Sequence, residues 1–105
     1  MIVEVRLRQL SRPPTLAEIT PYREALAVFE YEVERVISGE LPESVVRVAD
    51  WVIADGELLA SPVAGTTARL VLEPFISQPQ LESVYLANTL QPAEDGGTLF
   101  YAVAQ

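Results

Sequence analysis

The segment from Thr20 to Gly39 constrains the fold more than any other, because its apolar residues fit two different periods. With a period of two, apolar and acidic residues lie on opposite faces of a strand that turns at Ser38-Gly39. The inward residues are Phe29, Tyr31 and Val33, and the outward residues are Glu30, Glu32 and Glu34. Such a strand can pair its carboxylates with Arg6 and Arg8, on the outer face of the preceding predicted strand.

The same segment also has the features of a helix. Thr20 can act as the cap, Pro21 suits the first helical position, and Gly39 suits the end. Apolar residues at spacings of three and four form one stripe, which comprises Tyr22, Leu26, Phe29, Val33 and Val36. The stripe leaves out Val28 and Tyr31, and the residues alone keep both alternatives open.

The other segments give clearer signals. Strand patterns cover residues 2 to 8, 45 to 53, 66 to 73 and 99 to 103, and Asp55-Gly56 predicts a tight hairpin turn. Arg12-Pro13-Pro14 breaks regular structure, and the stretch from Glu94 to Gly97 is expected to be a loop. An apolar arc over Gln80 to Leu90 predicts one short helix.

Two folds follow, and they differ only in residues 20 to 39. A strand there gives a mainly β domain, a small OB-like antiparallel barrel of about five strands with one short helix. A helix there gives the order β-α-β-β-α-β of a ferredoxin-like α+β domain. The chain has 105 residues and room for one core, so residues 1 to 105 are expected to form a single domain.

The residues Tyr31, Val33, Val36 and Gly39 follow the pattern Tyr-x-Val-x-x-Val-x-x-Gly. With this pattern, residues 22 to 42 resemble the long strand and glycine turn of small OB-like barrel modules in bacterial envelope and secreted proteins. Residues 46 to 56 and 70 to 74 continue the resemblance over about half of the chain. It favours the barrel, and it implies a module that accompanies a polysaccharide-modifying or other envelope enzyme without catalysing a reaction.

Charge and composition limit the classes of function. Fifteen acidic residues stand against seven basic ones, all of them Arg, which gives a net charge of −8. Nucleic-acid binding is not expected, because it depends on a basic face. The chain has no Cys, His or Lys, so the most frequent general base and the thiol and amine nucleophiles are missing. We therefore expect a binding or interaction module rather than an enzyme, with no catalytic residue, cofactor or metal.

Four residues are the candidates for ligand contact, and they are Trp51, Asp55, Glu57 and Phe75. Trp51 can stack on a sugar ring, and Asp55 and Glu57 lie in the hairpin that follows it. Together with Asp50, these two acidic residues are also the nearest candidates for a glycosidase-like carboxylate pair, although an exposed hairpin tip is the simpler interpretation.

Two other groups have weaker functional interpretations. The acidic face of Glu30, Glu32 and Glu34 needs a further carboxylate to hold Ca²⁺, and a solvated face paired with Arg is simpler. The aromatic residues can form a stacking platform, although core and rim positions explain most of them. Besides Trp51, these residues are Tyr22, Phe29, Tyr31, Phe75, Tyr85, Phe100 and Tyr101.

A protein partner or a polysaccharide is the expected ligand of the barrel. The ferredoxin-like alternative would instead be a dimeric regulatory domain or a small enzyme built on carboxylates. The charged start of the chain does not resemble a signal peptide, and no apolar run is long enough for a transmembrane segment. A complete chain is therefore expected in the cytoplasm and an excised domain in the cell envelope; the sequence names no ligand, partner or oligomeric state.

Overall fold

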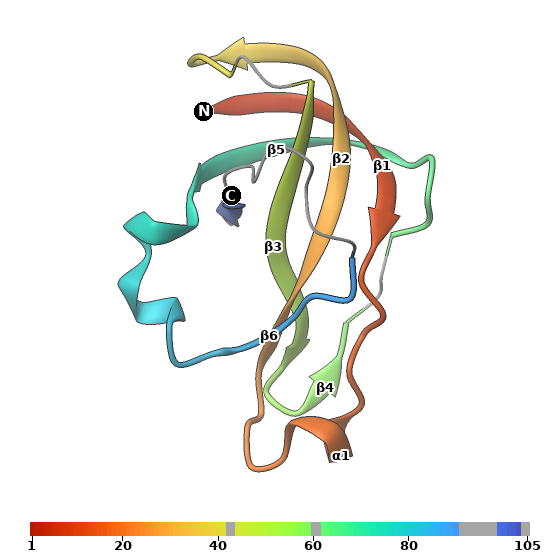
Figure 1. Cartoon of the computed structure of the whole chain (residues 1–105), viewed down its shortest axis with the longest axis vertical. Coiled ribbons are helices and arrows are strands. Elements are labelled where there is room, and N and C mark those ends of the chain that lie inside the picture. Colours follow the sequence, from red (N-terminus) through yellow and green to blue (C-terminus); the bar gives the residue numbers. More distant parts are fainter. Residues whose placement is uncertain (42–43, 60–61, 91–98, 104–105) are drawn as a thin grey trace.

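The computed structural model describes residues 1–41, 44–59, 62–90 and 99–103 (Figure 1). The domain is mainly β, which confirms the predicted fold class. The strands are β1 (Ile2–Leu10), β2 (Ala25–Ser38), β3 (Val45–Ala54), β4 (Glu57–Leu58), β5 (Thr67–Pro74), β6 (Tyr85–Ala87) and β7 (Leu99–Val103). The helical elements are the α-helix α1 (Leu16–Ile19) and the 3₁₀ helices η1 (Phe75–Ser77) and η2 (Pro79–Leu81).

Strand pairing closes a ring in the order β1, β2, β3, β7, β5 and back to β1. A ring leaves no unpaired edge among its members. The short strands β4 and β6 lie at the two ends of the strand order, next to β3 and β2. The pairs β3–β7 and β2–β6 are parallel, which the expectation of an antiparallel barrel did not include. The assignment of this barrel to the OB type stays a prediction.

Residues 25 to 38 form the long strand β2, so the helical interpretation and the ferredoxin-like alternative are wrong. Val28 and Tyr31, which the helical stripe leaves out, are both buried. The backbone of β2 forms its hydrogen bonds with β1 on one side and β3 on the other, so both residues can be buried without leaving backbone groups unpaired. Glu30 and Glu34 face outward and approach Arg8 and Arg6, at 3.5 and 3.3 Å, as the strand interpretation required.

Two apolar clusters lie on opposite sides of the barrel wall. The main core has buried side chains from β1, β2, β3, β5 and β7, among them Val5, Phe29, Val48, Leu72 and Phe100. A second cluster, called here the outer cluster, consists of buried Leu26, Ala49 and Leu81 with partly buried Trp51, Phe75, Val84, Leu99 and Tyr101. Alternation along β2, β3 and β7 directs these residues away from the main core, so the chain between β5 and β6 covers the outside of the wall.

The predicted helix over Gln80 to Leu90 is wrong. This stretch contains the end of η2 and then the strand β6, which pairs with the first residues of β2. Leu81 and Val84 pack in the outer cluster, whereas Tyr85 packs against the main core. The backbone of residues 85 to 87 forms its hydrogen bonds with the edge of β2, whereas a helix would form them within itself. The apolar residues that suggested a helix therefore anchor this stretch at two separate places, the outer cluster and the main core.

Within the described ranges, the one short α-helix is α1, directly after the break at residues 12 to 14. Thr15 caps it: its hydroxyl accepts from the Glu18 N–H at 3.2 Å, and the Glu18 carboxylate accepts from the Thr15 N–H at 3.3 Å. The predicted strands at residues 2 to 8, 45 to 53, 66 to 73 and 99 to 103 are confirmed. The predicted loop from Glu94 to Gly97 lies outside the described residues. Over the ranges that the structure describes, no helix is long and apolar enough to span a membrane.

Candidate functional site

The predicted hairpin at Asp55-Gly56 is confirmed, and it is fixed to the loop that precedes β2. Both turn residues have positive φ, 52° for Asp55 and 74° for Gly56, as a two-residue type I′ turn requires. The Gly56 N–H donates to the Arg23 carbonyl at 2.9 Å, and the Arg23 guanidinium donates to the Asp55 carbonyl at 3.1 Å. The φ of 74° at Gly56 favours glycine, and a Cβ atom there would also lie 3.0 Å from the Arg23 guanidinium.

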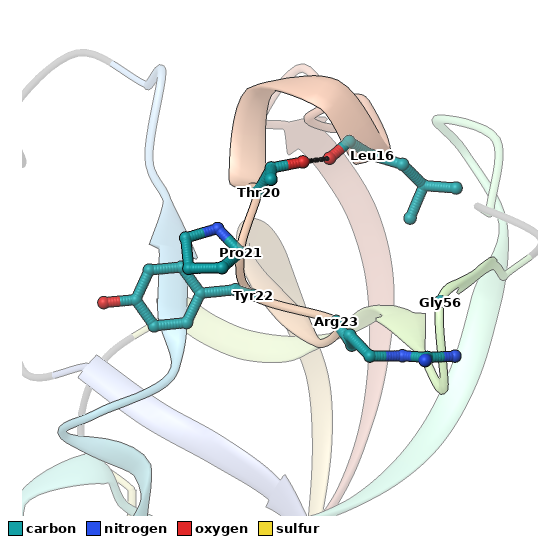
Figure 2. Close-up of a pocket in the computed structure, with 6 residues that line it drawn as sticks. All are labelled: Leu16, Thr20, Pro21, Tyr22, Arg23 and Gly56. Atoms are coloured by element: carbon teal, nitrogen blue, oxygen red, sulfur yellow. Dashed lines mark hydrogen bonds between the residues drawn. The ribbon is translucent and has the colours of Figure 1, made fainter.

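An open cavity of about 360 Å³ lies where α1, this loop and the hairpin meet (Figure 2). Its lining residues are Leu16, Thr20, Pro21, Tyr22, Arg23 and Gly56. Figure 2 shows the Leu16 side chain and the Arg23 guanidinium on the side of Gly56, whereas the Tyr22 ring extends the opposite way. The volume is at the small end of the range of about 300–1,000 Å³ for ligand pockets, and the cavity is largely open to solvent, so a ligand group would bind at the surface rather than be enclosed.

Large apolar side chains around this cavity are open to solvent. Leu16 is 41% exposed, Tyr22 is 53% exposed, and Leu58, directly beyond the hairpin, is 61% exposed. Figure 1 places α1 and β4 at the same end of the molecule. We call this region the α1–β4 surface and define it by its six residues, Leu16, Pro21, Tyr22, Arg23, Gly56 and Leu58.

Acidic side chains border the α1–β4 surface. Glu24, Asp55 and Glu57 are exposed, and each is adjacent in sequence to Arg23 or Gly56. In the described part of the chain, no ion pair engages any of the three carboxylates. The one guanidinium on the surface, that of Arg23, is held on the Asp55 backbone carbonyl. The border of the surface is therefore net negative.

The four predicted ligand residues fall into two pairs. Trp51 and Phe75 share the outer cluster, where both are partly buried and the Trp51 indole N–H donates to the Tyr101 hydroxyl at 3.0 Å. Asp55 and Glu57 lie exposed at the hairpin. Four residues of strand, about 13 Å, separate Trp51 from Asp55. The structure therefore brings Asp55 and Glu57 to the α1–β4 surface and leaves Trp51 and Phe75 apart; ligand contact by all four stays a prediction.

Asp50, one of the three carboxylates suggested for a glycosidase-like pair, lies partly buried in β3. Burial raises its pKa, and the hydrogen bond that it accepts from the Trp51 backbone N–H at 2.8 Å partly opposes this. Burial, and then the charge of Asp50, raises the pKa of Tyr31 to about 12. Asp50 lies about 16 Å along the strand from Asp55, beyond the roughly 5–9.5 Å between glycosidase carboxylates. The geometry does not favour a pair formed by Asp50 and Asp55.

The acidic face of β2 is used within the domain. Glu30 is 8% exposed and contacts both Arg8 and Arg47, and Glu34 contacts Arg6. The expectation that this face is solvated is therefore wrong for Glu30, which lies buried between two guanidinium groups. Among the described residues, no group of three acidic side chains is placed to hold a metal ion.

The sequence interpretation missed most of the α1–β4 surface. The Thr15-x-x-Glu18 pattern is a capping-box signature and could have located α1 with Leu16 at its first position. The contact between Arg23 and the hairpin joins residues 32 positions apart and has no local signal. Tyr22 was considered only as a helical or aromatic-platform residue.

Comparison with known proteins gave no match to a protein-family model, to a curated protein or to a solved structure.

Proposed function

We propose that the protein is a non-catalytic binding module that engages its ligand through the α1–β4 surface. One observation carries this proposal: the exposed side chains of Leu16 and Tyr22 line a cavity at one end of the domain, and exposed Leu58 lies in the strand β4 that follows the hairpin at its edge. Removing apolar surface from water lowers the free energy by about 25 cal/mol per Å². Exposed apolar residues beside a cavity are therefore favourable contact points for a ligand.

The position of this surface in the barrel supports the proposal. In OB-type barrels, the connections between the first and second strands and between the fourth and fifth strands contribute to ligand binding. Here the β1–β2 connection carries α1 and Tyr22, and the β5–β7 connection carries Tyr85, whose ring centroid lies 6.3 Å from that of Tyr22. The Thr89 hydroxyl accepts from the Arg12 N–H at 2.9 Å, so the two connections are also joined by a hydrogen bond.

The sequence has no His, Cys or Lys, so it lacks the most frequent general base and the thiol and amine nucleophiles. Only hydroxyl and carboxylate groups remain as nucleophiles, which supports binding rather than catalysis. The resemblance to envelope modules suggests the setting. In that setting the domain would accompany a polysaccharide-modifying or other envelope enzyme, and it would hold that enzyme's partner or substrate in place.

The test is retention on arrays of immobilised peptides and glycans, with variants that change exposed apolar residues. The double variant Tyr22→Ser/Leu58→Ser removes the two most exposed apolar side chains of the α1–β4 surface, which are 53% and 61% exposed. The matched control Val63→Ser/Ile76→Ser changes two apolar residues that are 73% and 91% exposed and lie outside it. We expect the first variant to lose at least about tenfold in affinity for every retained probe and the control to bind like the wild type.

Two results would contradict the proposal. Equal losses in both double variants would show that binding is not located at the α1–β4 surface. A time-dependent change in the mass of a retained probe, measured by mass spectrometry, would show that the domain is catalytic. Circular dichroism of each variant checks that the fold is kept.

A further inference from the structure

The arginines of the chain are all engaged within the domain. Six contact carboxylates: Arg6, Arg8, Arg12, Arg35, Arg47 and Arg69. The seventh, Arg23, donates to the Asp55 carbonyl. Among the described residues, several carboxylates have no arginine partner, and three of them, Glu24, Asp55 and Glu57, border the α1–β4 surface.

This charge distribution limits what can cover the α1–β4 surface. A second copy of the chain would bring a further charge of −8, and an acidic polysaccharide or a nucleic acid would also be repelled. A cationic ligand is attracted instead, because binding interfaces place opposite charges, and not like charges, against each other. Charge complementarity thus selects a neutral or positively charged occupant.

The cavity lining is mixed in polarity, but most of its polar side-chain groups are engaged within the domain or directed away from it, which favours an apolar group over a sugar ring. Leu16, Pro21 and Gly56 offer no polar side-chain atom, and the Thr20 hydroxyl already donates to the Leu16 carbonyl at 3.0 Å. The Tyr22 ring carries its hydroxyl away from Gly56 (Figure 2). The Arg23 guanidinium is held against the hairpin. A sugar must replace the hydrogen bonds that its hydroxyls make with water, whereas an apolar side chain has none to replace.

These observations concern the same surface as the proposed function, and the inference rests on that function. We propose that the occupant of the α1–β4 surface is a cationic polypeptide segment, which places one large apolar side chain in the cavity and directs flanking Lys or Arg side chains toward Glu24, Asp55 and Glu57. The apolar side chain supplies contact area, and the flanking cations supply orientation and a faster association rate.

The experiment uses the full chain and arrays of short peptides that carry one Leu or Phe and vary in net charge from negative to positive. A neutral glycan array is probed in parallel. The test variant is Glu24→Gln/Glu57→Gln, and the matched control is Glu40→Gln/Glu82→Gln, which removes the same charge from exposed positions elsewhere. Binding by each protein is measured at about 50 mM and about 500 mM salt, because this increase in salt shortens the screening length severalfold and weakens attraction between exposed charges.

We expect cationic peptides with an apolar residue to be retained, with at least about tenfold weaker binding to the test variant and at high salt. Equal losses in both glutamine variants would overturn the inference, because attraction would then come from total charge. Retention of neutral glycans alone, lost on Tyr22→Ser/Leu58→Ser, would overturn the peptide occupant and keep the proposed function. Retention of no probe, or retention unaffected by that double variant, would overturn both.

Discussion

Glu30 is the residue whose replacement tests the packing of the barrel wall most sharply. Its carboxylate lies 3.3 Å from the Arg47 guanidinium and 3.5 Å from that of Arg8. The side chains of Glu30 and Arg47 are 11% and 15% exposed, whereas that of Arg8 is 51% exposed. Glu30→Gln keeps the shape of the side chain and removes the charge that both guanidinium groups contact.

The expected loss is the sum of two unequal contacts. A half-exposed ion pair such as that with Arg8 contributes up to about 1 kcal/mol. A buried hydrogen bond between charged groups contributes about 1.5–3 kcal/mol, and the amide oxygen of Gln retains part of it. We therefore expect Glu30→Gln to lower the free energy of unfolding by about 2 kcal/mol.

Glu34→Gln is the matched control, because the Glu34 and Arg6 side chains are 42% and 52% exposed and the pair belongs to the same strands. We expect it to cost less than about 1 kcal/mol. Urea unfolding followed by the fluorescence of Trp51, the only tryptophan, gives both values. Losses of equal size for Glu30→Gln and Glu34→Gln would refute the reasoning that burial strengthens the Glu30 contacts.

Two further predictions concern Asp50 in β3 and the contact between Trp51 in β3 and Tyr101 in β7. Burial raises the pKa of Asp50, so the folded protein binds a proton at this carboxylate more tightly than the unfolded chain does. The charged carboxylate therefore destabilises the fold at neutral pH, and Asp50→Asn should raise the free energy of unfolding there. The stability gain of this variant should shrink as the pH falls toward about 4, where Asp50 becomes protonated in both the folded and the unfolded protein. Urea unfolding at several pH values measures this, and an unchanged difference across them would contradict it. Tyr101→Phe removes the acceptor of the Trp51 indole N–H and should cost about 0.5–1 kcal/mol with a shift in the fluorescence of Trp51; an unchanged spectrum and stability would argue against the bond.

The sequence predicted the strands because their burial repeats every two residues. The ambiguity over residues 20 to 39 arose because β2 is buried on both faces from Ala25 to Tyr31, and the partly buried residues that follow, Val33 and Val36, are three positions apart. The inner face packs in the main core, and Leu26 on the opposite face packs in the outer cluster. An apolar run that is buried on both sides has no distinct period, so periodicity alone cannot separate strand from helix there.

The candidate site was only partly predictable, because it depends on contacts between distant segments. Asp55 and Glu57 were found because Asp-Gly has a strong local preference for a tight turn. Nothing local indicates that Arg23 contacts this turn or that Leu58 stays exposed. Trp51 was a reasonable candidate by residue type, but segment 75–84 folds back over the barrel wall and makes it part of a second core.

The most direct test of the binding surface is chemical-shift mapping of the isotope-labelled protein during titration with a cationic peptide retained on the array. The account predicts that the largest changes in backbone amide shifts fall in residues 16 to 24 and 55 to 59. Changes concentrated around Trp51 and Phe75, with residues 16 to 24 unaffected, would contradict it and would transfer the binding site to the outer cluster.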